Sequence, residues 1–378
     1  MINLNNIKFA GNILTHDYVA SAPLMYTLTM DSSKIDSDLT DFPLLIHLAS
    51  DSGISNVNAT DIFTEVGTAS GKISIQLEDT TELDVEIESW DVDNQEAYLW
   101  VKVPQVSASE DISLNLYYGA DRTISSKVHE TGSAEGANVW TNNYFSVYHM
   151  GGYADSLNVY DLSVLNAPVG VSGGKINGGQ LFDGVDDGLQ TISSTFTGTD
   201  ITLSCWIKTT HDIGLSQTAL IQVQPAEAGR PMFALNYADW NVDSSGTNMI
   251  YTQQGPFGTV LNIFATNPAH NMGDGNWHHV VAVRDLTNNT GSIYIDGILG
   301  TPLNHTPSSW QRNVTGTLSP QDVGSYSITH NRYIGRATSY NTSFNGDIDE
   351  VRIENTARTA DWVKAEYNSG LDNLITFS

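Results

Sequence analysis

The stretch that most constrains the fold lies near the C-terminus, from Phe344 to Ile353, and reads FNGDIDEVRI. An aromatic residue followed by Asn-Gly is a turn signal that commonly precedes a strand. After it, Ile348-Asp349 and Val351-Arg352-Ile353 alternate apolar and charged side chains, as a half-buried strand does. The stretch therefore predicts a β-strand that begins at a turn and buries one face.

Five further motifs precede this stretch in a fixed order. They are LFDG at 181–184, ITLSCWI at 201–207, WHHVV at 277–281, IYIDG at 293–297 and YIG at 333–335. Each motif is weak alone, but the six in this order closely resemble the laminin-G-like, concanavalin A-like jelly rolls. The resemblance covers about residues 140–378, and it implies an all-β jelly-roll domain with a lectin-like role.

Composition supports an all-β chain and restricts its partners. The length of 378 residues fits two or three domains, strand-like segments are dense in Thr, Val, Ile and Tyr, and no long helical period appears. A net charge of −27 argues against nucleic acid and anionic membrane surfaces as partners. The single cysteine, Cys205, excludes internal disulfides and lies in an apolar strand pattern, so we expect it in the core.

Residues 24–125 are predicted to form a first β-sandwich. Strand-like segments lie at 25–29, 41–48, 73–78, 83–88, 97–104 and 112–119. The motifs FPLLIHL, EIESWD, WVKVP and YYG resemble those of a domain of unknown function that often precedes laminin-G-like jelly rolls. About 100 residues are enough for one such core.

Two segments outside these domains are polar. Residues 1–23 form an N-terminal arm with too few apolar residues to fold alone, and it either frays or docks on a neighbour. Residues 126–139 are rich in Gly, Ser and Ala, which predicts a flexible linker. The N-terminus shows no signal-peptide pattern, and no apolar stretch is long enough to span a membrane.

Two motifs bear on catalysis and histidine chemistry. Glu82, Asp84 and Glu86 resemble the catalytic strand of family 16 glycoside hydrolases, and a strand would align them on one face. The acidic alternation continues to Glu88, however, as on an exposed sheet face, with Leu83, Val85 and Ile87 on the core face, so we expect no catalysis there. A structural role is expected for His149 and for His278 and His279, whose side chains point to opposite faces of one strand.

The resemblance also implies a structural calcium that ties an N-terminal loop of the jelly roll to its last strand. The matching positions are Asp155 and Asp349, with a backbone carbonyl near Gly184. Oxygen atoms of these kinds are the ligands that Ca²⁺ prefers. Alternatively, Asp349 forms only a cap or a salt bridge to Arg352.

Four aromatic residues outside the core strands are candidates for ligand binding. Sugars stack on exposed rings while neighbouring amides and carboxylates bind their hydroxyl groups. The candidates are Trp240, Tyr251, Trp310 and Tyr340. The alternative is that these rings pack their own loops.

The C-terminal segment is predicted to hold a short helix capped by Thr359, with Trp362 and Tyr367 packed on the sandwich and a tail from Leu371 as an edge strand.

As a whole, the sequence predicts a non-enzymatic surface protein of a bacteriophage virion, a capsid decoration, fibre or tail adhesin that binds glycans. The N-terminal arm would contact other virion proteins. A bacterial extracellular adhesin or carbohydrate-binding module is the alternative, a glycoside hydrolase is a third, and homo-oligomerisation is left open.

Overall fold

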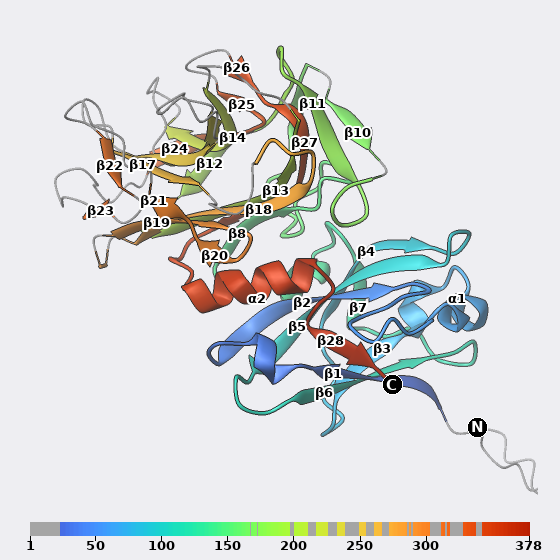
Figure 1. Cartoon of the computed structure of the whole chain (residues 1–378). Helices are drawn as coiled ribbons and strands as arrows, with labels where there is room; N and C mark the ends of the chain where they lie inside the picture. The colour runs from blue at the N-terminus through green and yellow to red at the C-terminus, as the bar shows by residue number, and fades with distance from the viewer. Residues whose placement is uncertain are drawn as a thin grey trace, which may run out of the picture.

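The computed structural model of the chain describes residues 23–166, 168–171, 173–196, 200–210, 217–225, 233–238, 249–254, 261–266, 272–285, 287–288, 290–302, 311–313, 316–317, 328–337 and 342–378. In this part of the chain, strands build an N-terminal sandwich and a larger C-terminal one, with helix α2 beside both (Figure 1). Neither of the two α-helices in the described residues is long and apolar enough to cross a membrane.

The N-terminal sandwich pairs two sheets, whose strand orders in the described residues are β28-β1-β6-β3 and β2-β5-β4-β7. The strands are β1 (Leu24–Met30), β2 (Leu39–Leu48), β3 (Ser74–Leu77), β4 (Val85–Asp91), β5 (Glu96–Val106), β6 (Ile112–Tyr118), β7 (Val128–Glu130) and β28 (Ile375–Phe377). The short helices are η1 (Ser32–Lys34), α1 (Asp61–Val66), η2 (Ser70–Lys72) and η3 (Gly136–Trp140). Pro43 lies on β2, at the edge of its sheet, where a missing N–H breaks no ladder.

The C-terminal sandwich is built from two larger sheets. One follows the order β10-β11-β27-β13-β18-β19-β20, and the other follows β21-β17-β16-β15-β14-β24-β12-β9. The first sheet also holds β8 and β23, with the bounds β8 (Tyr144–Tyr148), β10 (Val169–Val171), β11 (Gly179–Asp183), β13 (Ile201–Lys208), β18 (Trp277–Asp285), β19 (Thr290–Ile295), β20 (Ile298–Leu299), β23 (Gly316–Thr317) and β27 (Asn345–Glu354). The second also holds β22, with the bounds β9 (Ser163–Leu165), β12 (Gly188–Phe196), β14 (Gln217–Pro225), β15 (Phe233–Ala238), β16 (Met249–Gln254), β17 (Leu261–Thr266), β21 (Thr301–Pro302), β22 (Gln311–Asn313) and β24 (Ile328–Ile334). A small ladder joins β25 (Arg336–Ala337) to β26 (Thr342–Ser343).

Strand β27 is the predicted closing strand, and it lies inside its sheet. It pairs with β11 and β13, and its C-terminal half also pairs with β8. Ile348, Val351 and Ile353 are fully buried in the jelly-roll core, as the alternation predicts. The charged Asp349 and Arg352 between them are buried too, so the strand is not half-buried as expected. Cys205 of the neighbouring β13 lies in the same core, which confirms its expected place.

The expected flexible linker at 126–139 is wrong. Strand β7 pairs in parallel with β4, and η3 packs Val139 and Trp140 into the N-terminal core. The apolar residues of this segment are too few for a recognisable period, but the adjoining sandwich gives each of them a buried position. The segment is therefore an ordered part of the N-terminal sandwich.

The C-terminal boundary of the jelly roll also needs correction. Helix α2 (Ala360–Gly370) begins at Thr359, whose side chain caps the backbone N–H of Trp362 as predicted. Trp362 then packs on Phe42 of the N-terminal sandwich, with ring centroids 5.2 Å apart. Strand β28 pairs with β1, so the last residues complete the first domain and not the second (Figure 1). The physical reason is that β1 leaves a sheet edge open and β28 carries the apolar Ile375 and Phe377, both buried there.

Candidate binding cleft between the two sandwiches

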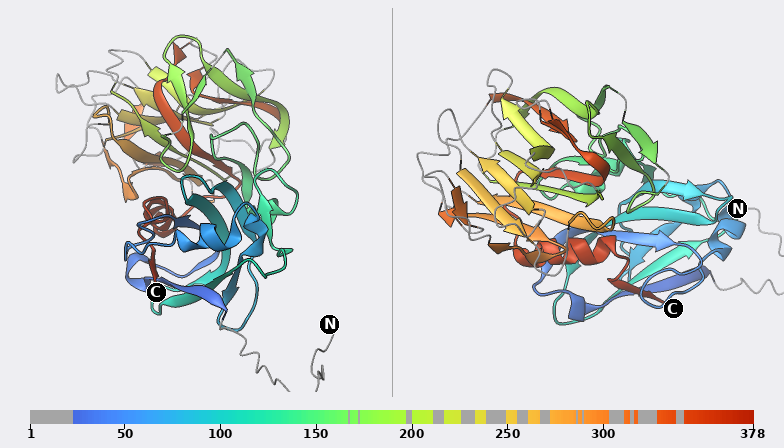
Figure 2. Two further views of the ribbon diagram at one scale, coloured as in Figure 1. Left: turned by 90° about the vertical axis from the view of Figure 1, so that its right-hand side faces the viewer. Right: turned by 45° about the horizontal axis from the view of Figure 1, so that its top comes forward.

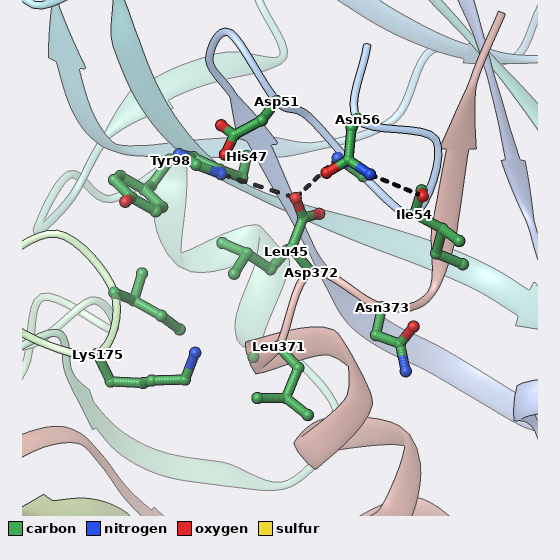
Figure 3. A pocket seen from close by; sticks show the side chains of 13 residues that line it. Leu45, His47, Asp51, Ile54, Asn56, Tyr98, Lys175, Leu371, Asp372 and Asn373 are labelled. Atoms are coloured by element: carbon green, nitrogen blue, oxygen red, sulfur yellow. Dashed lines mark hydrogen bonds and ion pairs between the residues drawn. The ribbon is translucent and has the colours of Figure 1, made fainter. Parts of the chain in front are cut away.

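A cleft of about 570 Å³ opens where four distant segments of the chain meet. Strands β2 and β5 and the loop after β2 form one wall, the loop before β11 contributes a second, and the turn after α2 contributes a third (Figure 3). Its polar lining includes His47, Asp51, Asn56, Tyr98, Lys175 and Asp372.

His47 contacts an aromatic ring and two carboxylates. Its ring stacks on Tyr98, with centroids 4.5 Å apart, because the two residues face each other across the β2–β5 ladder. Its Nε2 lies 3.0 Å from Glu96 and its Nδ1 lies 3.7 Å from Asp372. Burial alone would lower the pKa of His47, but the hydrogen bonds to Asp372 and Glu96 raise it above its usual value.

Asp372 holds the turn after α2, which forms the third wall of the cleft, against the N-terminal sandwich. It lies in the left-handed backbone region just after α2, with φ of 54°. Its carboxylate accepts a hydrogen bond of 2.8 Å from the backbone N–H of Gly53, which belongs to the loop after β2. The position of the C-terminal turn is therefore tied to the N-terminal sandwich at the floor of the cleft (Figure 3).

Lys175 is the contribution of the C-terminal sandwich. Its ammonium lies 4.9 Å from the ring centroid of Trp206, and burial lowers its pKa. The side chain is thus held by an aromatic face in a partly dry environment and brings a donor to the cleft.

The cleft combines hydrogen-bonding groups with small apolar surfaces. Carboxylate, amide, hydroxyl and ammonium groups converge on it, while Ile54 and Leu371 expose 36% and 39% of their surface beside them. A polyhydroxylated ligand needs this mixture, because its hydroxyls require directed partners and its C–H faces require apolar contact.

The aromatic residues predicted from the sequence are not among the described residues that line this cleft. Trp240, Trp310 and Tyr340 lie outside the described residues. Only the backbone of Tyr251 is described, on β16 between Asn236 and Phe264 of the adjacent strands. The residues of the cleft come from four segments far apart in the sequence, and no local pattern indicates that they meet.

The residues expected to bind calcium already have backbone partners. The Asp155 carboxylate accepts hydrogen bonds from the N–H groups of Val147 and Tyr160, each 3.0 Å long. Asp349 accepts from Ile176 and from Glu350. Backbone amides therefore already orient both carboxylates, and calcium binding at these residues stays a prediction.

The third of these positions, Gly184, follows Asp183 at the end of β11. Its φ is +80°, and an added Cβ would lie 2.8 Å from Asn345. Glycine is thus required by both backbone and space. The nearby carboxylates of Asp183, Asp186 and Asp187 converge within 4.8 Å, and those of Asp183 and Asp187 also accept backbone N–H groups.

The acidic alternation on β4 departs from its expected exposure. Leu83, Val85 and Ile87 do form the core face. Glu86 and Glu88, however, expose 0% and 2% of their side chains, because the C-terminal sandwich covers them. Burial raises the pKa of Glu88 to about 8, although the adjacent His149 acts in the opposite direction.

The other two carboxyl-bearing positions of that motif have partners of their own. Asp84 pairs with Lys102 and Lys127 at 3.4 and 2.9 Å, and Glu82 accepts a hydrogen bond from Ser125. These contacts engage the groups that the glycosidase motif would need.

The adjacent histidines on β18 have separate surroundings. His278 lies between Asp296 and Asp274, at 2.9 and 3.2 Å. His279 is buried beside Trp206, with ring centroids 5.1 Å apart, and burial lowers its pKa. Both arrangements agree with a structural role.

Comparison with known families identifies two segments. Residues 183–364 match the model of the concanavalin A-like lectin/glucanases superfamily, and residues 70–141 match a domain of unknown function (DUF2341). The chain therefore carries a laminin-G-like, concanavalin A-like domain preceded by a DUF2341 domain. No curated protein matches the chain.

Several solved structures resemble part of this chain. Domain 4 of AbnA, a GH43 extracellular arabinanase from Geobacillus stearothermophilus in complex with arabinotriose, has 18% identity and a TM-score of 0.43, over 59% of this chain and 97% of that one. The binding domain of Paraclostridial Mosquitocidal Protein 1 has 13% identity and a TM-score of 0.44, over 60% and 52%. The botulinum neurotoxin serotype D ligand-binding domain in complex with N-acetylneuraminic acid has 10% and 0.43, over 60% and 50%. At these values the likeness says nothing about ligand or activity.

Proposed function

We propose that this chain, in which a DUF2341 sandwich precedes a concanavalin A-like domain, is a non-enzymatic glycan-binding protein of a particle or cell surface. The observation that carries the proposal is the cleft, where amide, carboxylate and hydroxyl groups meet exposed apolar side chains. It has the volume of an ordinary small-ligand site, and both sandwiches contribute to its lining.

The glycan we propose is neutral. A net charge of −27 repels polyanionic polysaccharides at long range. Within the cleft, the carboxylates of Asp51 and Asp372 offset the positive charge of Lys175 and His47, so the lining offers no excess positive charge to an anionic ligand. Hydroxyl groups, by contrast, donate well to such carboxylates.

For the setting we favour the surface of a bacteriophage virion, where the polar N-terminal arm would attach the protein to other virion components. The alternative is a bacterial extracellular adhesin or carbohydrate-binding module. Immunogold electron microscopy with an antibody against the chain separates them. Labelled particles support the virion, whereas label on cells or in the medium alone supports the bacterial setting.

The glycan-binding function is tested with the purified chain on a glycan array. We expect retention by a set of related neutral glycans that survives 0.5 M salt, since hydrogen bonds and stacking, unlike surface charge pairs, are weakly screened. Retention only by anionic glycans, or by none, would contradict the proposal. Turnover of a bound β-glucan that is lost in Glu82→Gln would instead support a glycoside hydrolase.

A further inference from the structure

A buried group of ionisable side chains lies between the two sandwiches, next to Trp100 of β5. We call it the interface cluster: Glu86 and Glu88 of β4, His149 just after β8, and Glu350 of β27. These side chains expose only 0%, 2%, 4% and 1% of their surface. Neither the family matches nor the glycan cleft accounts for so many carboxylates in a dry interface.

Three potential ligand atoms in the cluster converge. The Nδ1 atom of His149 lies 2.7 Å from a Glu350 oxygen and 3.4 Å from a Glu88 oxygen. One atom from each of the three residues lies within 4.8 Å of the other two. A single cation between them could contact all three after small side-chain movements.

The surrounding contacts orient these three side chains. The second ring nitrogen of His149, Nε2, faces Glu86 at 3.4 Å, and Trp140 donates to the same Glu86 oxygen. Metal-binding histidines typically donate their other N–H to a carboxylate in this way. Trp100 donates to Glu88 over 2.9 Å, so its ligand oxygen is also held.

Acidic side chains outnumber basic ones in the cluster. The carboxylates of Glu86, Glu88 and Glu350 surround one imidazole, and the guanidinium of Arg352 is shared between Glu350 and Glu366. In addition, Oε1 of Glu86 and Oε1 of Glu88 are buried with no hydrogen-bond partner among the described residues. Buried unpartnered carboxylate oxygens are costly unless a cation or donor satisfies them.

We propose that Glu88, His149 and Glu350 bind one divalent transition metal, which joins β4 of the N-terminal sandwich to β27 of the C-terminal one. One imidazole and two carboxylates suit Zn²⁺ or Mn²⁺, whereas Ca²⁺ requires more oxygen ligands than converge here. The metal takes the place of the proton between His149 and Glu350. This structural site is independent of glycan binding.

The test uses the full chain, unfolded in guanidinium and refolded with excess Zn²⁺ or with EDTA. After dialysis, elemental analysis measures the metal per chain and calorimetry measures Tm. We expect close to one Zn²⁺ per chain and a Tm higher by roughly 3 °C than that of the EDTA sample, the size expected for a ligand at about a hundred times its Kd. Mn²⁺ is tested in the same way.

Glu88→Gln keeps the size of the side chain and its contact with Trp100 but removes a ligand. Glu366→Gln is the matched control, because it changes a buried carboxylate of the same interface that lies outside the three ligands. We expect Glu88→Gln to lose the metal and the Tm difference and Glu366→Gln to keep both. Wild-type protein that refolds without either metal, at one Tm in both buffers, would overturn the proposal whether or not the variants fold. Equal metal loss in both variants would also overturn it.

Discussion

His47 connects one wall of the cleft to another. Its ring bridges Glu96 of the adjacent strand and Asp372 of the C-terminal turn, while Tyr98 covers one face of the ring. Both acidic partners favour the protonated ring, so the folded-state pKa of His47 lies above 6.5, its ordinary value. His47 is therefore more than half protonated at the pH where an exposed histidine is half neutral.

We expect an NMR titration to give His47 a midpoint above 6.5 and Asp372→Asn to lower it. Because folding raises this pKa, the stabilisation by His47 is complete below its unfolded pKa and is lost as pH rises through its folded pKa. The Tm difference between wild type and His47→Gln should accordingly be larger at pH 6 than at pH 8.5. A His47 midpoint at or below 6.5 would show that burial outweighs the two carboxylates.

The single residues also show where sequence patterns succeed and fail. The burial of Leu83, Val85 and Ile87 follows from local alternation, because the N-terminal sandwich alone provides their core. The same alternation predicts exposure for Glu86 and Glu88, and that prediction fails. Their burial depends on β27, more than 250 residues later in the chain, which no local pattern on β4 can indicate.

At the scale of elements, α2 contacts both sandwiches and β28 joins the N-terminal one. The helix packs Trp362 on the N-terminal core and stacks Tyr367 on Trp206 of the C-terminal sandwich, with centroids 5.6 Å apart. Strand β28 then extends the sheet of β1 (Figure 2). The sequence predicts the helix, its Thr359 cap and an edge strand, but the sheet that receives this strand depends on long-range topology.

Phe377→Ala should destabilise the whole chain by about 3 kcal/mol, the usual cost of removing a buried phenylalanine. Phe377 is 3% exposed and contributes to the N-terminal core, next to Tyr26. Thr376→Ala on the opposite face of β28 is the control and should change little. The measurement is equilibrium unfolding in denaturant, and equal small effects in both variants would mean that β28 adds little to the sandwich.

At the scale of the whole molecule, strong acidity and a neutral ligand have a measurable consequence. Affinity for a neutral glycan should change less than about twofold between 50 mM and 500 mM salt, because hydrogen bonds to hydroxyls are weakly screened. Affinity titrations at the two salt concentrations check this prediction, and a steep fall in affinity would indicate that ionic contacts dominate.

The all-β class and the two-domain order follow from sequence motifs alone.

The most direct test of the account asks whether the cleft binds the glycan. Isothermal titration calorimetry with the strongest array ligand should be run on wild type, Asp51→Asn and Asp93→Asn. Asp51 lines the cleft, whereas Asp93 lies exposed in the turn between β4 and β5 and undergoes the same chemical change. We predict about tenfold weaker binding for Asp51→Asn, as expected when a hydrogen bond to a charged group is lost, and wild-type affinity for Asp93→Asn. Equal affinity in all three proteins, with Asn373→Ala in the cleft also unchanged, would place the glycan elsewhere and contradict the account.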